Sequence, residues 1–344
     1  MLSQLARITV VSLGALTAWP TFLAAACQLP LPTIQVVYVI SGTRIVEFDT
    51  AGNFITQFGG TGSGPGQFLL PSGITTDFDF NFQAGSVYVT DALLNRVQKF
   101  DSCGNLQLQF GSTGTGPGFL YQPYSIAIDG AGRIWIADTG NHRIQVFDRT
   151  GAWVAQFGGL GGGNGQFNAP VGISLGGSGS LNGSNLGQVL WVADTGNNRI
   201  QQFNVSNGPP PNYTPSLTFN LKFGFYGNGN GQFRGPFTIA ADTTDVWVAD
   251  SQNQRIQQFT PSGAFVRSIS PFSFASPYGI ALDVPIPFLG AVVLGVWSVD
   301  YNTNKVTLFS TTGAKLVSFG TTGGGPGQLF QSTYIATGPS GFLP

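Results

Sequence analysis

The sequence predicts an all-β protein folded as a six-bladed β-propeller of four-stranded blades. Three observations predict this fold: a block of eleven residues recurs six times, short runs of alternating polar and apolar residues surround each copy, and the C-terminal segment supplies a strand that the first copy lacks. The composition agrees, because 50 glycines and 29 phenylalanines suit short strands joined by tight turns. Four-stranded sheets repeated around an axis form a propeller.

The repeated block has a constant anatomy. An apolar triplet precedes an aspartate, and a basic residue five positions later opens an alternating run that ends in phenylalanine. The copies are spaced by roughly 45–55 residues, which is the length of a propeller blade. The clearest copies are ADTGNHRIQVF (137–147), ADTGNNRIQQF (193–203) and ADSQNQRIQQF (249–259), with weaker copies at 90–100 and 299–309 and a shorter one at 40–48.

The rest of each copy completes four strands. A polar turn such as DRTG (148–151) follows the block, then a run ending in Phe-Gly, a glycine-rich loop such as GGTGSGPGQF (59–68) and a further run into the next triplet. Period-2 alternation bounded by Gly, Asp and Asn predicts strands joined by turns. The first copy starts at Ile34 without its innermost strand, and GQLFQSTYIA (327–336) supplies it. We therefore expect the two chain ends to share one blade and close the ring.

The N-terminal segment predicts export. Arg7 precedes an apolar run over 8–26 that ends in three alanines, which is the pattern of a cleavable signal peptide. A membrane anchor is the alternative, because the run is just long enough to span a bilayer. The predicted organisation is a signal peptide at 1–26, a linker at 27–33 and the propeller at 34–344. We expect a periplasmic, outer-envelope or extracellular location.

Cys27 and Cys103 are the only cysteines. Cys27 follows the predicted cleavage site directly, so one hypothesis is lipid attachment, although Ala24 stands where such signals prefer leucine. The other hypothesis is a disulfide between Cys27 and Cys103, which an exported protein permits. Both place the protein outside the cytoplasm.

The repeated block resembles a known family. The pattern A-D-[TS]-x-N-x-R-[IV]-Q-x-F, followed by G-Q-F-x-x-P-x-G-I-A, is similar to the NHL repeat, and GNHRIQVF (140–147) lies close to the motif that names it. The resemblance extends over essentially the whole mature chain and implies a propeller. It leaves function open, because propellers of this kind include extracellular binding domains, RNA-binding domains, and lyases or hydrolases.

A constant spacing of five positions between an aspartate and an arginine or lysine in five of the six copies predicts scaffold pairs. Aspartate accepts backbone N–H groups in a tight turn, while arginine packs its stem on a neighbouring blade and pairs with the acid. The alternative, catalytic carboxylates, is disfavoured because the same pair recurs in five copies. The predicted pairs are Asp91/Arg96, Asp138/Arg143, Asp194/Arg199, Asp250/Arg255 and Asp300/Lys305, and the aromatic residues before each aspartate (Tyr88, Trp135, Trp191, Trp247, Trp297) are predicted as core.

The chemistry required by most enzymes of this fold is missing from the composition. One histidine (His142), one glutamate (Glu47) and two cysteines cannot build a multi-histidine zinc site. His142 occupies a slot that holds Asn95, Asn198, Gln254 and Asn304 in other copies, so it is predicted to be a polar residue of the repeat. We expect no enzyme activity, cofactor or metal. A lyase or hydrolase with His142 as its base is the alternative.

Charge disfavours nucleic acid as a partner. The 14 basic and 15 acidic residues nearly cancel, whereas phosphate contacts need clustered Lys and Arg. The RNA-binding function that the resemblance also implies is therefore disfavoured. The same charge balance leaves the N-terminus as the only expected contact with a membrane.

Two faces of the predicted ring are candidate binding surfaces. With strands labelled a to d from the axis outward, the a–b and c–d turns share one face, here called the turn face, and the b–c turns and blade connections share the other, the connection face. Long insertions at 78–86, 175–188, 204–216 and 284–295 fall on the turn face, as does Cys103. The turn face is therefore predicted to meet a partner or the envelope.

The connection face offers a second candidate site at the mouth of the central channel. Aromatic residues follow the prolines that open inner strands, and amide-rich turns lie nearby, so the group is predicted to bind a small ligand or peptide. Its members are Tyr124, Asn141, His142, Asn197, Asn198, Phe237 and Tyr278. Taken together, the sequence predicts an exported, monomeric, non-enzymatic binding or scaffold propeller whose partner is an unidentified protein or small ligand.

Overall fold

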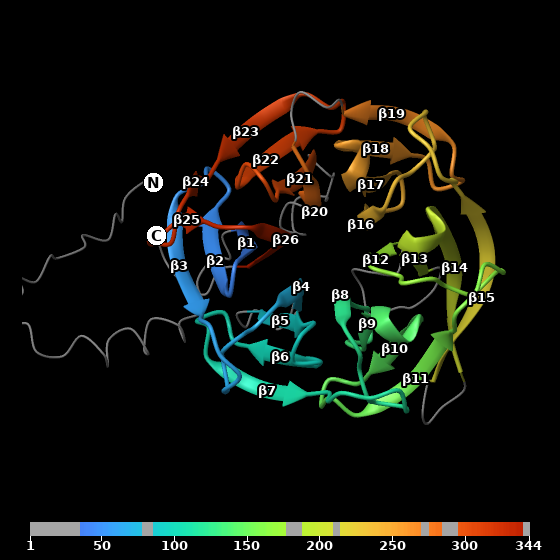
Figure 1. Cartoon of the computed structure of the whole chain (residues 1–344), viewed down its shortest axis with the longest axis horizontal. Coiled ribbons are helices and arrows are strands. Elements are labelled where there is room, and N and C mark those ends of the chain that lie inside the picture. Colours follow the sequence, from blue (N-terminus) through green and yellow to red (C-terminus); the bar gives the residue numbers. More distant parts are fainter. Residues whose placement is uncertain are drawn as a thin grey trace, which may run out of the picture.

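A computed structural model describes residues 35–77, 85–176, 188–208, 214–269, 275–283 and 295–339. Six four-stranded antiparallel sheets stand around a central axis (Figure 1). The chain moves from one sheet to the next in sequence order, and each sheet is ordered from the axis outward. The predicted six-bladed propeller is confirmed.

The strands of each blade match the runs seen in the sequence. Blade 1 contains β26 (Ser332–Pro339), β1 (Gln35–Ser41), β2 (Arg44–Asp49) and β3 (Phe54–Gly59). Blade 2 contains β4 (Pro71–Asp77), β5 (Ser86–Asp91), β6 (Arg96–Phe100) and β7 (Leu106–Phe110). Blade 3 contains β8 (Pro123–Ile128), β9 (Ile134–Asp138), β10 (Arg143–Phe147) and β11 (Trp153–Gly158).

The remaining blades repeat this order. Blade 4 contains β12 (Ile173–Gly176), β13 (Val189–Asp194), β14 (Arg199–Asn207) and β15 (Pro215–Phe223). Blade 5 contains β16 (Pro236–Ala241), β17 (Val246–Asp250), β18 (Arg255–Phe259) and β19 (Phe265–Ile269). Blade 6 contains β20 (Pro277–Asp283), β21 (Gly295–Asp300), β22 (Lys305–Ser310) and β23 (Lys315–Phe319). Short 3-10 turns η1 (Thr139–Asn141), η2 (Thr195–Asn197) and η3 (Ser251–Asn253) join the middle strands of blades 3 to 5, and the short strands β24 (Thr321–Thr322) and β25 (Gln328–Leu329) pair in parallel in the last connection.

The core lies between the blades. Middle strands such as β9 and β10 are buried along their whole length, whereas the outer strand β11 alternates between exposed and covered residues. The predicted core aromatics Tyr88, Trp135, Trp191, Trp247 and Trp297 are all fully buried. Burial on both faces explains why the middle strands are apolar at successive positions and the outer strands alternate.

The C-terminal strand closes the ring. β26 pairs antiparallel with β1, with Val39 opposite Ile335 and Val37 opposite Thr337. The first and last strands of the described chain therefore belong to one sheet, as the orphan strand in the sequence predicted. Closure therefore pairs the axis-facing edge of β1, which the N-terminal part of blade 1 leaves open.

Hydroxyl side chains join the inner strands across every blade interface. Each bridge uses a Ser or Thr of one inner strand and a backbone group of the next, so it satisfies polar groups near the axis without charge. The bridges run from Thr76 Oγ1 to the carbonyl of Thr337 (2.7 Å), Ser72 Oγ to that of Pro123 (2.6 Å), Ser125 Oγ to that of Ile173 (3.4 Å), the Ala241 N–H to Ser174 Oγ (3.0 Å), Thr238 Oγ1 to the carbonyl of Tyr278, and Thr337 Oγ1 to that of Leu282 (3.1 Å).

Several sequence predictions concern residues outside the described ranges. These are the signal peptide, the linker with Cys27, and most of the four insertions on the turn face. Cys103 takes part in a disulfide, and its pairing with Cys27 stays a prediction. Over the described part of the chain, no helix is long and apolar enough to cross a membrane.

Candidate functional site

Three of the predicted scaffold pairs are buried ion pairs at the connection face. The Nε atom of Arg143 lies 2.7 Å from Asp138 Oδ2, and equivalent contacts join Arg199 to Asp194 (2.7 Å) and Arg255 to Asp250 (2.8 Å). In each pair the acid is the last residue of the second strand and the base opens the third, so strand register places them opposite each other. The three aspartates are fully buried.

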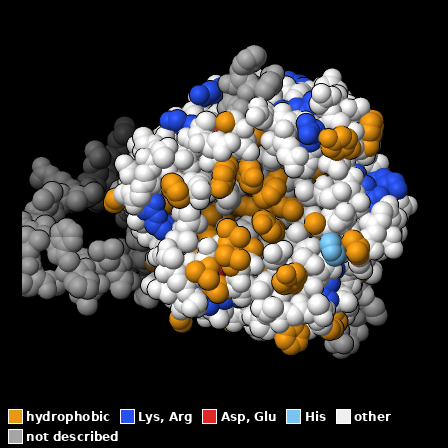
Figure 2. All heavy atoms as spheres, viewed as in Figure 1, with side chains coloured by type: hydrophobic (Ala, Val, Ile, Leu, Met, Phe, Trp, Pro, Cys, Tyr) orange, Lys and Arg blue, Asp and Glu red, His pale blue; other side chains and the backbone are white. Residues whose placement is uncertain are grey.

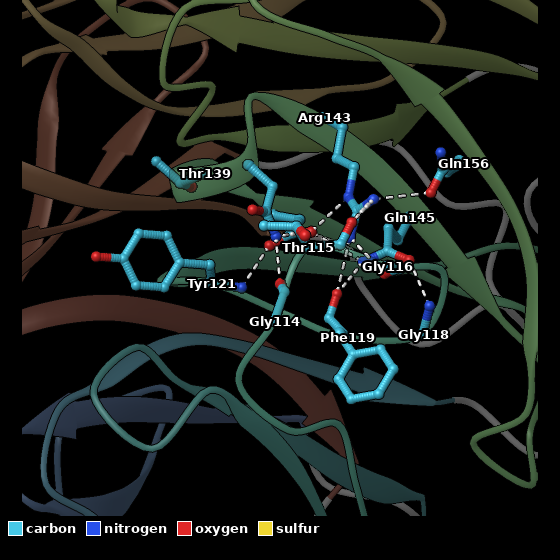
Figure 3. A network of polar contacts seen from close by, with 12 residues as sticks. Gly114, Thr115, Gly116, Gly118, Phe119, Tyr121, Thr139, Arg143, Gln145 and Gln156 are labelled. Carbon is cyan, nitrogen blue, oxygen red and sulfur yellow. Dashed lines mark hydrogen bonds and ion pairs between the residues drawn. The ribbon is translucent and has the colours of Figure 1, made fainter.

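Each arginine also holds the glycine-rich loop that connects its blade to the preceding one. Figure 3 shows the network in blade 3, where Arg143 donates to the carbonyls of Thr115 (2.7 Å), Gly116 (2.8 Å) and Phe119 (2.9 Å). The loop therefore turns its carbonyls toward the guanidinium. A phosphate cradle needs N–H groups in that position, so this loop is a blade connection, as predicted.

The carboxylate of Asp138 is fully engaged by donors. Oδ1 accepts the N–H of Tyr121 (2.7 Å), while Oδ2 accepts from Asn141 Nδ2 (2.9 Å) and Gln145 Nε2 (2.8 Å) in addition to Arg143. Asp194 and Asp250 accept from the same kinds of donor. A carboxylate surrounded in this way holds the turn and the loop together and has no oxygen left for a substrate.

Blade 2 departs from the predicted pairing, which needs correction there. Arg96 donates to the carbonyls of Ser63, Gly64 and Gln67, but its buried Nε has no hydrogen-bond partner in the described structure. Asp91 Oδ1 instead accepts the N–H groups of Leu93 (3.1 Å) and Leu94 (3.0 Å). The reason is local, because Leu93-Leu94 replaces the Gly-Asn of blade 3 and the acid caps the turn. Burial lowers the pKa of Arg96, against the charge of Asp91, which raises it.

Blade 6 departs in another way. Asp300 accepts the N–H groups of Ala275 and Ser276 (both 2.7 Å), and exposed Lys305 donates to the Gly320 carbonyl (2.6 Å). Among the described residues these two side chains form no ion pair. A lysine has a single charged nitrogen, so it cannot reach the acid and the loop carbonyls together as an arginine does.

His142 is a connector between blades. Its Nδ1 accepts the N–H of Ala169 (2.9 Å) in the connection to blade 4, which assigns the proton of the neutral ring to Nε2. Its backbone is left-handed (φ 57°), like the other residues of the slot. Asn95 Oδ1 accepts from Gln122 (2.7 Å) and Asn198 Oδ1 from Gly235 (3.0 Å) in the same manner. His142 therefore accepts a backbone N–H from the next blade connection, as Asn95 and Asn198 do at the same position of their blades.

The predicted channel-mouth residues divide into two groups. Tyr124, Phe237 and Tyr278 come together: Phe237 lies 6.0 Å from Tyr124 and 4.4 Å from Tyr278 between ring centroids. By contrast, Asn141 and Asn197 donate to the carbonyls of Gly114 (2.9 Å) and Gly161 (2.8 Å), and Asn198 and His142 accept backbone N–H groups. The aromatic residues form a cluster, whereas the amide side chains and the histidine hydrogen-bond the backbone of the blade connections.

Two tyrosines that the sequence reasoning missed complete the aromatic cluster. Tyr334 of β26 lies 5.8 Å from Phe237, and Tyr301 stacks on Tyr278 at 5.0 Å. Alignment of the C-terminal strand with the other inner strands places Thr333, and not Tyr334, at the position of Tyr124 and Phe237, so the repeat gives no signal for Tyr334. Burial raises the pKa of Tyr124, Tyr278 and Tyr334, so these phenols remain protonated at neutral pH.

Glycines in alternate blades make room for the aromatic cluster. A Cβ on Gly73 would lie 2.2 Å from the carbonyl of Tyr124, and one on Gly172 would lie 2.6 Å from that of Phe237. Gly279 of blade 6 would meet the carbonyl of Thr333 at 2.8 Å. The inner strands of blades 2, 4 and 6 thus let those of blades 3, 5 and 1 approach closely at the channel mouth.

The connection face is apolar and lacks exposed acids among the described residues. Figure 2 shows this face, identified by the pale blue His142, with hydrophobic side chains over its centre and Lys and Arg toward the rim. The described acids outside the buried network lie in turns of the opposite face or, like Glu47, in the core. The exposed large hydrophobic side chains on the connection face are Leu69, Leu70, Leu93, Phe119, Tyr121, Leu160, Phe225, Tyr226 and Phe330.

No group of three or more His, Cys, Asp or Glu that could hold a metal ion occurs within the described ranges. The polar groups of the connection face are hydroxyls, amides and exposed Lys222, Arg234 and Lys305. These groups can form packing contacts, hydrogen bonds and ion pairs.

The chain resembles known proteins in one repeat and in its fold. The NHL repeat model matches residues 120–147, which include the Asp138–Arg143 pair. A chain in the crystal structure of a nidogen/laminin complex is similar over 88% of this chain and 98% of that one, with 13% identity and a TM-score of 0.57. Virginiamycin B lyase from Staphylococcus aureus is similar over 72% of this chain and 69% of that one, with 19% identity and a TM-score of 0.47. No curated protein matches the sequence.

The described chain is a six-bladed β-propeller. Its third blade matches the NHL repeat, the strand order of that blade recurs in all six blades, and its buried aspartate–arginine pair recurs in blades 4 and 5.

Proposed function

We propose that this protein is an exported, non-enzymatic binding propeller whose connection face docks on a protein partner. The observation that carries the proposal is the set of nine exposed large hydrophobic side chains on that face, together with the absence of exposed carboxylates from its described residues. Monomeric proteins rarely expose apolar side chains in such a group without an interaction site. The sequence prediction favoured the turn face; the connection face is proposed here because the nine exposed hydrophobic side chains lie on it.

The charges on this face define the kind of partner. Lys222, Arg234 and Lys305 are exposed there, and Arg44 is half-buried. A complementary protein would present apolar side chains surrounded by carboxylates, which steer association and exclude basic surfaces. The few basic residues are too sparse for a phosphate backbone, which needs clustered Lys and Arg.

The fold is compatible with such a role, since a chain of this fold is part of a nidogen/laminin complex. Catalysis has little support. The aspartates on this face are saturated with donors, and the single histidine bonds a backbone N–H. Export rests on the N-terminal pattern in the sequence.

Site-specific photocrosslinking in the native envelope tests the proposal. A photoreactive residue replaces Leu93 (57% exposed) on the connection face or, as a matched control, Leu316 (53% exposed) on outer strand β23. We expect one protein to crosslink from position 93 and not from position 316. With that protein purified, Leu93→Asn combined with Phe330→Ser should weaken binding by at least about ten-fold, and Leu316→Ser should leave it unchanged.

Other outcomes would refute the proposal. Equal crosslinking from both positions would mean that the connection face is not selective. A ribonuclease-sensitive product would indicate RNA, and crosslinking to lipid alone would indicate a membrane surface. An affinity that does not fall with added salt would contradict the charge argument.

A further inference from the structure

Four aromatic side chains, here called the aromatic arc, curve around the channel mouth of the connection face. Between ring centroids, Phe237 lies 6.0 Å from Tyr124 and 4.4 Å from Tyr278, and Tyr301 stacks on Tyr278 at 5.0 Å. All four residues are half-buried, so each ring packs inward on one part and meets solvent on another. Figure 2 shows hydrophobic side chains over the centre of this face, where the inner strands that carry three of these residues begin.

Tyr301 departs from the repeat in a way that the scaffold does not require. Blades 3, 4 and 5 carry Thr139, Thr195 and Ser251 at this position, and each hydroxyl donates to the carbonyl of the proline that leads into the next blade (2.5–2.7 Å). Tyr301 forms no such bond in the described structure and stacks on Tyr278 instead. Blade 6 therefore has an aromatic surface in place of a hydrogen bond between blades, which favours a binding role over a structural one.

The phenol hydroxyls of the aromatic arc are available to a ligand. Those of Tyr124, Tyr278 and Tyr301 form no hydrogen bond in the described structure and, unlike the hydroxyl of Tyr334, they are not buried. Burial, followed by the nearby phenols of Tyr301 and Tyr124, raises the pKa of Tyr278, so the three hydroxyls lie close together. A protonated phenol donates a hydrogen bond, so the arc presents ring faces with uncharged donors beside them.

A polyproline II helix has the complementary surface. Its backbone forms no internal hydrogen bonds, so its carbonyls are free to accept from phenols, and its proline rings pack on aromatic faces. Its conformation is preformed, so little conformational entropy is lost on binding. An α-helix, by contrast, pairs its backbone carbonyls internally and would leave the phenols without acceptors.

Positive charge lies beside the aromatic arc and not within it. Exposed Arg234 precedes Phe237 by three residues, and exposed Lys305 follows Tyr301 by four. The described part of this face has no exposed carboxylate. Carboxylates next to a run of prolines would therefore be attracted, and basic residues there would be repelled.

We propose that the aromatic arc binds a proline-rich segment of the partner protein in the polyproline II conformation, with carboxylates next to the prolines. Proline rings pack on Phe237 and Tyr278, and phenols of the arc donate to the backbone carbonyls of the segment. The flanking carboxylates meet Arg234 and Lys305. This inference rests on the proposed function, because it names the part of the partner that contacts the centre of the connection face.

Fluorescence anisotropy of a labelled peptide, titrated with the intact protein, tests the site. The probe peptide consists of eight L-prolines with an aspartate at each end, and the matched peptide has D-prolines with the same aspartates. We expect saturable binding of the L-proline peptide. The D-proline peptide should bind at least about ten-fold more weakly, because its helix has the opposite hand and directs its carbonyls differently.

Four variants identify the contacts. Tyr301→Thr introduces the residue that blades 3 and 4 carry at this position, so it removes the stacked ring and should weaken the L-proline peptide at least about ten-fold. Tyr278→Phe removes one hydroxyl and should weaken it about five-fold, and Arg234→Gln removes one charge and should weaken it about three-fold. Tyr226→Thr is the matched control, because it alters a tyrosine of the same face (65% exposed) outside the aromatic arc, and it should leave binding unchanged.

Several results would overturn the proposal. They are the absence of saturable binding of the L-proline peptide, equal affinity for the two peptides, and equal effects of Tyr301→Thr and Tyr226→Thr. Near-ultraviolet circular dichroism verifies that each variant is folded, and if Tyr301→Thr fails to fold, the comparison of Tyr278→Phe with Tyr226→Thr decides. Saturable binding of cellohexaose in place of the peptide would indicate a carbohydrate site and would also refute the proposal.

Failure of this inference can be told apart from failure of the proposed function. A protein that crosslinks from position 93 and binds the Tyr301→Thr variant as tightly as the wild type would keep the docking face and refute the proline-rich segment. If no protein crosslinks from position 93, the proposed function itself fails.

Discussion

Replacing Arg143 by alanine should destabilise the propeller by about 3–5 kcal/mol, the usual cost of removing one partner of a buried ion pair. The side chain of Arg143 is only 8% exposed and bonds Asp138, three loop carbonyls and Gln156 Oε1 (2.9 Å). The substitution leaves a buried carboxylate with its remaining donors and three carbonyls without a charged donor. The lower half of the range is expected, because Asp138 keeps bonds from Tyr121, Asn141 and Gln145.

Blade 2 provides the internal reference. Arg96 holds the equivalent loop through three carbonyls but forms no ion pair with Asp91 in the described structure. Arg96→Ala should therefore cost only the loop bonds, about 2 kcal/mol. Arg143→Lys should fall between wild type and Arg143→Ala, because blade 6 shows that a lysine reaches one carbonyl only.

Urea unfolding followed by tryptophan fluorescence measures these differences, provided that the m-value is the same for each variant. Buried Trp135 reports from the same blade. Hydrogen exchange over residues 111–120 shows whether the loss begins in the connection. If Arg96→Ala costs as much as Arg143→Ala, the ion pair contributes nothing and the reasoning fails.

Three further predictions follow. Asp283 accepts hydrogen bonds from Trp297 Nε1 (3.0 Å) and Gln35 Nε2 (3.0 Å), and burial raises the pKa of its carboxyl group. The folded protein should therefore lose stability as the pH rises from about 4, the ordinary pKa of an aspartate, through the raised pKa of Asp283. Asp283→Asn keeps both accepted bonds, so it should raise the melting temperature at pH 7 and flatten the pH dependence of that temperature. Asp129 occupies the same place in blade 3 but is ion-paired with Arg133 at 2.6 Å, so Asp129→Asn should cost about 3 kcal/mol of stability. Equal effects of the two substitutions would contradict this prediction. His142→Asn should change the free energy of unfolding by less than about 0.5 kcal/mol. His142→Ala should lower it by about 1–2 kcal/mol, because alanine loses the hydrogen bond to Ala169 while the positive φ remains. Calorimetry measures both variants, and an alanine variant as stable as the wild type would refute the role given to His142. A chain that ends at residue 331 lacks β26, so blade 1 should unfold before the other blades, and the amide hydrogens of β1 should exchange rapidly. Protection of these amide hydrogens would show that the closing strand is dispensable.

The sequence predicted the fold because its signals are local and repeated. Alternation of period two marked each strand, and the orphan run at 327–336 identified the closing strand. The loss of the ion pair in blade 2 was not predictable in that way. Aspartate and arginine stand at the same spacing there, and only the turn made by Leu93-Leu94 shows that the carboxylate is used elsewhere.

The candidate site was predicted only in part. Tyr124, Phe237 and Tyr278 were found because each follows a proline in the repeat. Tyr334 was missed, because it meets them only after a strand some three hundred residues from β1 joins the first blade. The asparagines and His142 were assigned to a ligand because composition cannot show that a backbone N–H from the next connection already occupies them.

Ring closure has a consequence for how the molecule opens. A linear array of repeats has two terminal units, each held on one side only, and these units fray first. Here each blade has a neighbour on both sides, and a hydroxyl bridge crosses every one of the six interfaces. When one interface separates, the other five keep its two sides tethered at high effective concentration, so rejoining is a first-order event. A single separated interface should therefore close again before neighbouring interfaces open. Lasting separation of the blades requires two interfaces to be open at once.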